Sequence, residues 1–302
     1  MYLEHFKLTD LPFGLTPDVD FFCNLKGHEE ALNVILYSLN TGEGFIKITG
    51  EVGSGKTLLC RKILKTLDSE QYHQAYIPNP GLTPIELRKA LAYELGMDLS
   101  KLQDQHEILL KINDKLLEIN KSGKQVVLLI DEAQALSFET LEAIRLLTNL
   151  ETEKHKLLQV ILFGQPELDE MLSKRNLRQL KQRITFSYSL PLMTREELDS
   201  YLFHRLAVVG CNTSSLFSKR AKDLVYKSSN GIPRLVNILC HKAMLAAYGK
   251  GMNRITPKVM NIATSDGSAI SFRNTTTLTI YIFLVGVLAV SIVTLCILEG
   301  LI

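Results

Sequence analysis

The most informative stretch of this chain is Gly50-Glu51-Val52-Gly53-Ser54-Gly55-Lys56-Thr57, followed by Leu58. It fits the pattern Gly-x4-Gly-Lys-[Ser/Thr], in which glycines let backbone amides converge on phosphate oxygens without side-chain clash. A helix after the loop adds free N–H groups and the positive end of its dipole. We therefore predict that residues 50–58 bind a nucleotide, with Lys56 reaching the β- and γ-phosphates and Thr57 binding Mg²⁺.

The sequence around this loop alternates between two kinds of segment. Short β-type runs cover Phe45–Thr49, Ala75–Pro78, Val126–Ile130, Leu158–Phe163 and Ile184–Ser189. Helical stretches between them cover about residues 55–68, 84–96, 103–121 and 137–151. Such alternation is typical of βα units, so residues 44–190 are predicted to form an α/β nucleotide-binding core with a mainly parallel sheet.

An acidic pair ends the most apolar of these runs. Val126–Ile130 is continuously apolar, as expected of a strand covered on both faces, and Asp131 and Glu132 follow it. We expect Asp131 to hold the metal ion, directly or through water, and Glu132 to polarise a water for attack on the γ-phosphate. Gln134 either senses the nucleotide or caps the following turn. Together with the loop, these residues fit phosphoryl transfer to water.

Two further segments flank the core. Residues 1–43 form an N-terminal lead that is expected to pack on the core. Residues 191–263 change to an all-helical pattern, which opens with a capping box made by Thr194 and Glu197. Later helix starts are indicated by Ser218, Pro233 and Thr256. We predict a separate helical domain over residues 191–263.

The C-terminal part of the sequence predicts a membrane anchor. Residues 264–277 are typical of a linker, and residues 278–298 follow with the apolar sequence LTIYIFLVGVLAVSIVTLCIL. About 20 apolar residues suffice to cross a bilayer as a helix, so residues 278–298 are predicted to span a membrane, with a buried core helix as the alternative. Basic residues precede the span and Glu299 is the charge that follows it, which places the N-terminal bulk in the cytoplasm.

Composition narrows the classes of function. The formal net charge is +2, from 34 basic and 32 acidic residues, which gives no strong electrostatic footprint for nucleic acid. The 5 cysteines and 7 histidines show no metal-ligand spacing. No local motif suggests a Ser/His/Asp or Cys/His arrangement, so nucleotide hydrolysis is favoured over other kinds of hydrolysis.

At these residues the chain resembles the AAA+ ATPases, and more narrowly the family of general secretion pathway protein A with its pilus-biogenesis branch of the MshM type. The resemblance covers about residues 1–262 and includes four more motifs: Leu11-Pro12-Phe13, Gly164-Gln165-Pro166-Glu167-Leu168, Gln182-Arg183-Ile184 and Gly231-Ile232-Pro233-Arg234. It implies a P-loop NTPase core, a lid over residues 191–263, and ATP with Mg²⁺ as ligands. It also implies that Phe13 and His28 frame the adenine, although a packed hydrophobic turn would explain them equally.

The resemblance implies roles for polar residues outside the loop. Gln165 matches the sensor that orients the attacking water. Arg183 matches the arginine that enters the site of a neighbouring subunit, where it stabilises charge on the transferred phosphoryl group, and Arg178 is a second candidate. Arg234 matches the lid sensor that contacts the γ-phosphate. The alternative for Arg183 is an ordinary surface charge.

We therefore expect a membrane-anchored AAA+ ATPase, single-pass in the bacterial inner membrane, that drives or switches assembly of a type IV (MSHA-like) pilus or a type II secretion machine. Expected partners are further copies of the chain, as a dimer or ring, and inner-membrane assembly proteins. Larger relatives carry a periplasmic peptidoglycan-binding region after the span, whereas this sequence ends at Ile302; the shorter pilus-biogenesis form is the closer match, and a direct role in remodelling the cell wall is not expected. Two alternatives remain: a DNA-associated ATPase of the transposition-regulator type, against which the charge balance and the span weigh, and a nucleotide-switched scaffold with little turnover.

Overall fold

The computed structural model describes residues 2–78, 81–98, 105–152, 156–211, 213 and 215–265. The chain divides into two compact units, Met1–Ala263 and Thr264–Ile302. Apart from Thr264 and Ser265, the predicted linker 264–277 and the predicted span 278–298 lie outside the described residues. Within the described ranges, no helix combines the length and the apolar character that a membrane crossing needs.

In the part of the chain that the structure describes, five strands form a parallel sheet in the order β2-β3-β4-β1-β5. The strands are β1 (Phe45–Gly50), β2 (Tyr72–Ile77), β3 (Gln125–Ile130), β4 (Leu158–Gly164) and β5 (Phe186–Leu190). Because all five run in the same direction, their carboxyl ends share one edge of the sheet. The predicted α/β core with a parallel sheet is confirmed.

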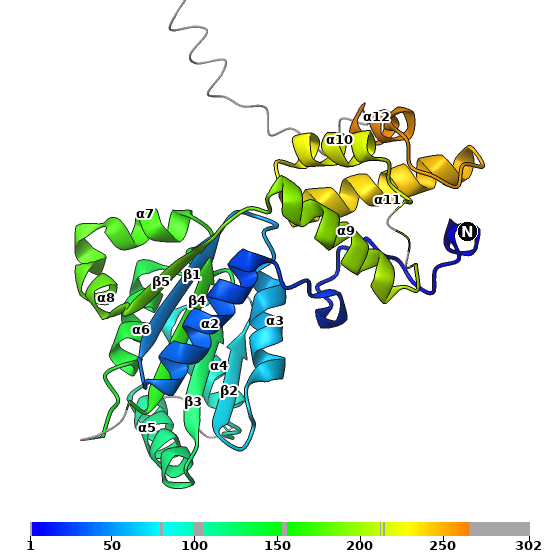
Figure 1. Ribbon diagram of the computed structural model, residues 1–302. Coiled ribbons are helices and arrows are strands. Elements are labelled where there is room, and N and C mark those ends of the chain that lie inside the picture. The colour runs from blue at the N-terminus through cyan, green and yellow to red at the C-terminus, as the bar shows by residue number, and fades with distance from the viewer. Residues whose placement is uncertain are drawn as a thin grey trace, which may run out of the picture. The chain divides into compact units, whose positions relative to one another are not determined.

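Helices cover both faces of this sheet (Figure 1). Successive residues of a strand point to opposite faces, so Leu128 packs on one side and Leu129 on the other, and both are fully buried. One face is covered by α2 (Lys26–Asn40) and α3 (Lys56–Thr66). The other face is covered by α4 (Pro84–Glu94), α5 (Gln105–Lys121), α6 (Phe138–Leu147), α7 (Glu167–Ser173) and α8 (Arg178–Arg183), with short 3-10 turns η2 (Ala133–Ala135) and η3 (Arg175–Leu177).

A second apolar cluster is built mainly by helices. Its elements are α9 (Arg195–Val208), α10 (Lys219–Ser229), α11 (Pro233–Gly249), α12 (Pro257–Ser265), α1 (Tyr2–Phe6) and η1 (Val19–Phe21). The N-terminal lead, expected to pack on the core as one segment, divides in the structure. Tyr2, Leu8, Phe13, Phe21 and Leu25 join this helical cluster, whereas Phe22 and α2 pack on the sheet. The reason is apolar burial, since the ring of Phe13 is 1% exposed and packs edge-on against Phe217.

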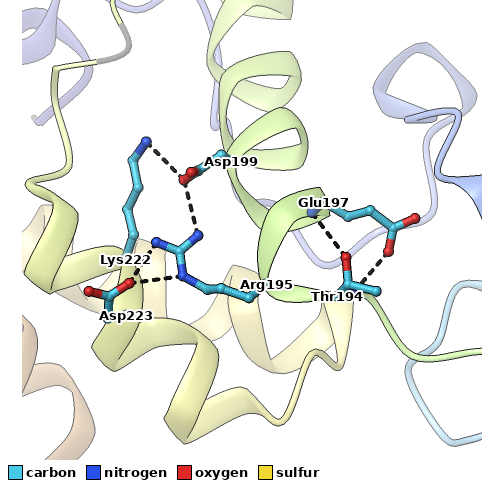
Figure 2. Close-up of polar contacts among 6 residues, drawn as sticks. All are labelled: Thr194, Arg195, Glu197, Asp199, Lys222 and Asp223. Carbon is cyan, nitrogen blue, oxygen red and sulfur yellow. Dashed lines mark hydrogen bonds and ion pairs between the residues drawn. The ribbon is translucent and has the colours of Figure 1, made fainter.

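The helix starts predicted from sequence are confirmed at α9, α10 and α11. Thr194 and Glu197 form the capping box of α9, in which the Thr194 hydroxyl accepts from the Glu197 backbone N–H and the Glu197 carboxylate accepts from the Thr194 N–H (Figure 2). Ser218 caps α10, and Pro233 opens α11. Ion pairs of Lys222 with Asp199 and of Arg195 with Asp223 then tie α9 to α10, while Arg195 also pairs with Asp199 within α9 (Figure 2).

Candidate nucleotide-binding site

The phosphate-binding loop joins the end of β1 to the start of α3, at the carboxyl edge of the sheet. Gly53 and Gly55 have φ angles of 79° and 101°, which residues with a side chain rarely adopt. Space is short as well: a Cβ on Gly53 would lie 2.7 Å from Cβ of Arg234, and a Cβ on Gly55 would lie 2.8 Å from Nε2 of His28. Both positions therefore require glycine for the loop to keep this shape.

Lys56 opens α3 and is 5% exposed. Its Nζ donates to the carbonyl oxygens of Gly50 at 2.7 Å and of Glu51 at 2.9 Å. Burial lowers the pKa of Lys56, and the nearby carboxylates of Glu132 and Asp131 oppose that shift. A buried ammonium held by neutral carbonyls is suited to exchange them for phosphate oxygens, because hydrogen bonds between two charged groups are stronger.

Asp131 follows β3 and is 2% exposed. Burial raises the pKa of its carboxyl, while hydrogen bonds from the Thr57 hydroxyl and the Glu132 backbone N–H oppose that shift. A buried carboxylate beside a hydroxyl supplies the oxygen ligands that Mg²⁺ prefers. The Ser54 hydroxyl is also buried, at 1% exposure, and has no hydrogen-bond partner within the described residues. The groups present therefore fit a magnesium nucleotide.

Glu132 lies just beyond Asp131 in a left-handed conformation, with φ of 53°. Its Oε2 accepts from Nε2 of Gln165 at 3.1 Å and also from Nε2 of Gln134. The Gln165 backbone N–H in turn donates to Oε1 of Gln134 at 3.0 Å. The two amides thus fix the carboxylate at the carboxyl ends of β3 and β4.

Most of these groups line one cavity. Lys56, Thr57, Glu132, Gln165 and Arg234 border a hollow of about 180 Å³. Arg234 is exposed, and its backbone N–H donates to the carbonyl oxygen of Gly53 at 3.2 Å, so the start of α11 touches the loop directly. The structure therefore gathers the strand ends, the loop and the start of α11 around the same space.

A further part of the cavity wall was missed by sequence reasoning. It consists of residues 14–18 of the lead, with Tyr201 and Arg205 of α9 and Asn237 of α11. The Tyr201 hydroxyl donates to Oδ1 of Asn237 at 2.8 Å, and Arg205 donates through Nη2 to the carbonyl oxygen of Gly14 at 3.1 Å. No local motif marks these residues, because their meeting depends on contacts between distant parts of the chain. The weak signal that could have been used is Asn237 itself, a polar residue within an apolar run of α11.

Phe13 and His28 do not line this cavity among the described residues. Phe13 is buried in the helical cluster, as noted above. His28 is 6% exposed and contacts the loop from outside the cavity, since its Nε2 lies 3.1 Å from the carbonyl oxygen of Ser54. Framing of the base by these two residues is therefore not supported by their placement.

Arg183 lies near the amino ends of the strands, whereas the phosphate-binding loop lies at their carboxyl ends. Thr185, two residues later, donates its backbone N–H to the carbonyl oxygen of Phe45, the first residue of β1, whereas the loop follows the last residue of β1. At ~3.3 Å per strand residue, the length of β1 separates these two ends of the sheet by roughly 20 Å. Nη1 of Arg183 lies 3.4 Å from Oγ1 of Thr148, beside a separate hollow of about 300 Å³. Arg178 is exposed on α8.

Comparison with known proteins agrees with this geometry. Residues 39–172 match the model of a protein family described as an AAA domain. The chain is also similar to the general secretion pathway protein A of Aeromonas hydrophila, with 40% identity over 291 residues. That match covers 96% of this chain but only 53% of the relative, so the chain spans about half the length of the curated protein.

Solved structures show the same fold at low sequence identity. The ORC2 protein of Aeropyrum pernix, in complexes with ADPNP and ADP, has a TM-score of 0.62 at 18% identity, covering 84% of this chain and 72% of its own. Cdc6p of Pyrobaculum aerophilum has a TM-score of 0.64 at 16% identity, covering 85% and 72%. At such identities the likeness shows a shared fold and nothing further about activity.

Proposed function

Because the chain belongs to the family of general secretion pathway protein A and carries the AAA+ P-loop fold, we propose that it binds ATP with Mg²⁺ and hydrolyses it. The observation that carries this proposal is the convergence of a loop that requires glycine, a buried lysine and a carboxylate held by two amides on one cavity. Loop and lysine are the parts that bind phosphates, and the carboxylate is the part that activates water.

The residues of the site divide the tasks of this reaction among them. Residues 50–58 hold the phosphates, and Lys56 releases the loop carbonyls to meet the β- and γ-phosphates. Thr57 and Asp131 would hold Mg²⁺, which when bound neutralises charge on the phosphates. Glu132 takes the proton of the attacking water, and Gln165 orients that water as well as the carboxylate.

We further propose that residues 191–263 act as a lid on the core. Arg234 would contact the γ-phosphate, and its backbone contact with Gly53 makes the start of α11 sensitive to the state of the loop. Arg183 lies too far from the loop of its own chain to reach a nucleotide there, so it would serve the site of a neighbouring copy. ATP binding would then close the lid and complete the site in a dimer or ring.

The cellular role is inferred from the relative. We propose that residues 278–298 anchor the chain in a bacterial inner membrane with the ATPase part on the cytoplasmic side. There it would drive or switch assembly of a type II secretion machine or a type IV, MSHA-like pilus together with inner-membrane assembly proteins. The identity to a secretion pathway protein over 96% of this chain supports secretion or pilus assembly over other AAA+ roles.

The test is ATP hydrolysis by the purified full chain across a range of protein concentrations. Glu132→Gln should bind ATP but lose turnover by roughly 100-fold or more, because the base is gone. Arg183→Ala should lose turnover by a similar factor, whereas Arg220→Ala, a surface arginine on α10, should not. If the wild-type chain binds ATP but does not hydrolyse it at any concentration, the proposed hydrolysis is wrong and the chain acts as a nucleotide switch.

A second function is favoured by one observation. The segment 174–183 carries five cations, of which Lys174, Arg175, Arg178 and Lys181 are exposed and Arg183 is half-buried. Such a segment suits a DNA-associated ATPase, since phosphate contacts release counterions and give binding that weakens with salt. Binding to duplex DNA at about 50 mM salt that weakens steeply by about 200 mM would support this function. Absence of binding at the lower salt would remove it.

A further inference from the structure

His28 contacts the phosphate-binding loop through a single hydrogen bond from outside the cavity. Its Nε2 lies 3.1 Å from the carbonyl oxygen of Ser54, and a carbonyl can only accept, so Nε2 carries the proton. The ring also fills the space that a Cβ on Gly55 would need. In a loop whose N–H groups turn toward an anion, the carbonyls turn away and need donors from the surrounding protein. His28 supplies that donor for Ser54.

The neutral form of His28 is the one this contact uses. The ring is buried at 6% exposure and meets the ring of Phe22 edge-on, with centroids 5.8 Å apart. Burial lowers the pKa of His28, which favours the neutral ring with its proton on Nε2. The side chain is therefore a fixed donor rather than a mobile surface group.

Lys26, two residues before His28, is bound to a residue of α9. Its backbone N–H donates to Oε1 of Glu197 at 3.1 Å. The other carboxylate oxygen of Glu197 accepts from the Thr194 backbone N–H at 2.8 Å and closes the capping box of α9 (Figure 2). One carboxylate thus caps α9 and also holds the first turn of α2.

Gly27, between these two residues, packs against the link from β5 to α9. A Cβ on Gly27 would lie 2.5 Å from Cγ of Pro191, so the helix can approach the link this closely only with glycine there. Pro191 follows Leu190, which pairs with Gly50 at the base of the loop. Three successive residues of α2 therefore touch α9, the link and the loop.

From these contacts we infer that His28 is a positioning residue for the phosphate-binding loop, and that the turn Lys26–His28 couples the loop to the start of α9 through Glu197. This inference rests on the proposed binding of ATP at the loop. A shift of α9 moves Glu197, the turn follows, and the Ser54 carbonyl moves with His28. The loop amides then leave the arrangement that fits phosphates, so nucleotide affinity responds to the position of α9.

The first experiment measures ATP affinity of the full chain by equilibrium binding and steady-state kinetics. His28→Leu removes the donor and should weaken ATP binding about tenfold, because a buried carbonyl is left without a partner. His28→Gln can place an amide N–H near the same point and should recover affinity to within about threefold of wild type. KM should rise more than kcat falls, since the bond serves the bound substrate and the transition state alike.

His73→Leu is the matched control. Nε2 of His73 also lies 3.1 Å from a backbone carbonyl, that of Glu94, but at the start of β2 and away from the loop. It should leave ATP affinity within about twofold of wild type. Equal losses in His28→Leu and His73→Leu, or no loss in His28→Leu, would overturn the inference while wild-type binding stands. A wild-type chain without affinity for ATP would overturn the proposed function as well.

The second experiment isolates the coupling. Thr194→Ala and Glu197→Ala both break the capping box of α9, but only Glu197→Ala also removes the acceptor of the Lys26 N–H. Glu197→Ala should weaken ATP binding several-fold more than Thr194→Ala, at about the cost of one hydrogen bond. It should also speed amide hydrogen exchange of residues 51–57 in the nucleotide-free chain. Equal ATP affinities and equal exchange rates in the two variants would overturn the coupling. If His28→Leu does not fold, the comparison of Thr194→Ala with Glu197→Ala tests the inference by itself.

Discussion

The site depends on single residues whose roles follow from what their polar atoms touch. Asp131 and Glu132 are neighbours in sequence, yet one is buried beside Thr57 and the other lies half-buried among two amides. The first arrangement suits a metal ligand and the second a base, because a base needs access to water. The motif predicts both residues, but the distinction between them is visible only with their partners.

Gln134 makes a contact that neither of its two sequence interpretations names. The sequence predicts that it senses the nucleotide or caps a turn. In the structure its amide links Glu132 to the backbone of Gln165. We expect Gln134→Leu to lower kcat by roughly tenfold while ATP affinity stays within about twofold, because the carboxylate loses one of its two amide donors but the loop is untouched.

Single-turnover hydrolysis together with equilibrium ATP binding checks this expectation. Gln71→Leu, at an exposed position just before β2, is the matched control and should change neither quantity. A Gln134→Leu variant that loses affinity and kcat in equal measure would assign Gln134 to the packing of the loop instead.

At the scale of helices and strands, buried apolar runs are the most predictable features. The sequence predicts β3 and β4 to within a residue because both of their faces are covered, which leaves an almost continuous apolar sequence, with Gln159 as the polar residue within β4. β2 begins at Tyr72, three residues before the predicted run, because it is an edge strand whose first residues are polar and half-buried. α7 and α8 were missed since each is short, although the leucines at 168, 172, 177 and 180 are buried and recur near helical spacing.

Three helices carry histidines that make folding stability depend on pH. Burial lowers the pKa of His28 on α2, of His204 on α9 and of His241 on α11 below the ordinary value of 6.5. Below pH 6.5 the unfolded chain takes up protons that the folded chain refuses, so the free energy of unfolding falls as pH falls. The loss is complete once pH passes below the lowered pKa values.

We therefore expect lower stability at pH 5.5 than at pH 7.5, measured by urea unfolding of the full chain. His241→Gln should flatten this dependence because it removes one of the three groups, while keeping an amide that can serve the Tyr2 hydroxyl now 3.0 Å from Nδ1. Identical slopes for wild type and His241→Gln between these pH values would contradict the assignment.

For the molecule as a whole, the sequence predicts the cavity residues that belong to contiguous motifs better than those that distant segments contribute. The loop and the acidic pair are contiguous motifs, so their types and spacing suffice to place them at strand ends. Arg205 and Asn237 come from the helical part and contact Gly14 of the lead, which lies 191 and 223 residues earlier in the chain. Tyr201 lines the same cavity. Such long-range contacts leave no periodic trace in a single sequence.

The position of Arg183 leads to a prediction about assembly. The full length of β1 separates Arg183 from the phosphate-binding loop of its own chain. A role of Arg183 in catalysis therefore requires the loop of another copy. We expect Glu132→Gln and Arg183→Ala chains to be inactive alone but active when mixed, because a site with intact Glu132 can then receive Arg183 from its neighbour. In an equal mixture that assembles at random, about a quarter of all sites combine both intact groups. ATP hydrolysis measured across mixing ratios should therefore peak near equal amounts at about a quarter of the wild-type rate. A mixture that stays as inactive as its components, while size measurements show that the chains do associate, would place any action of Arg183 within its own chain and remove the shared site.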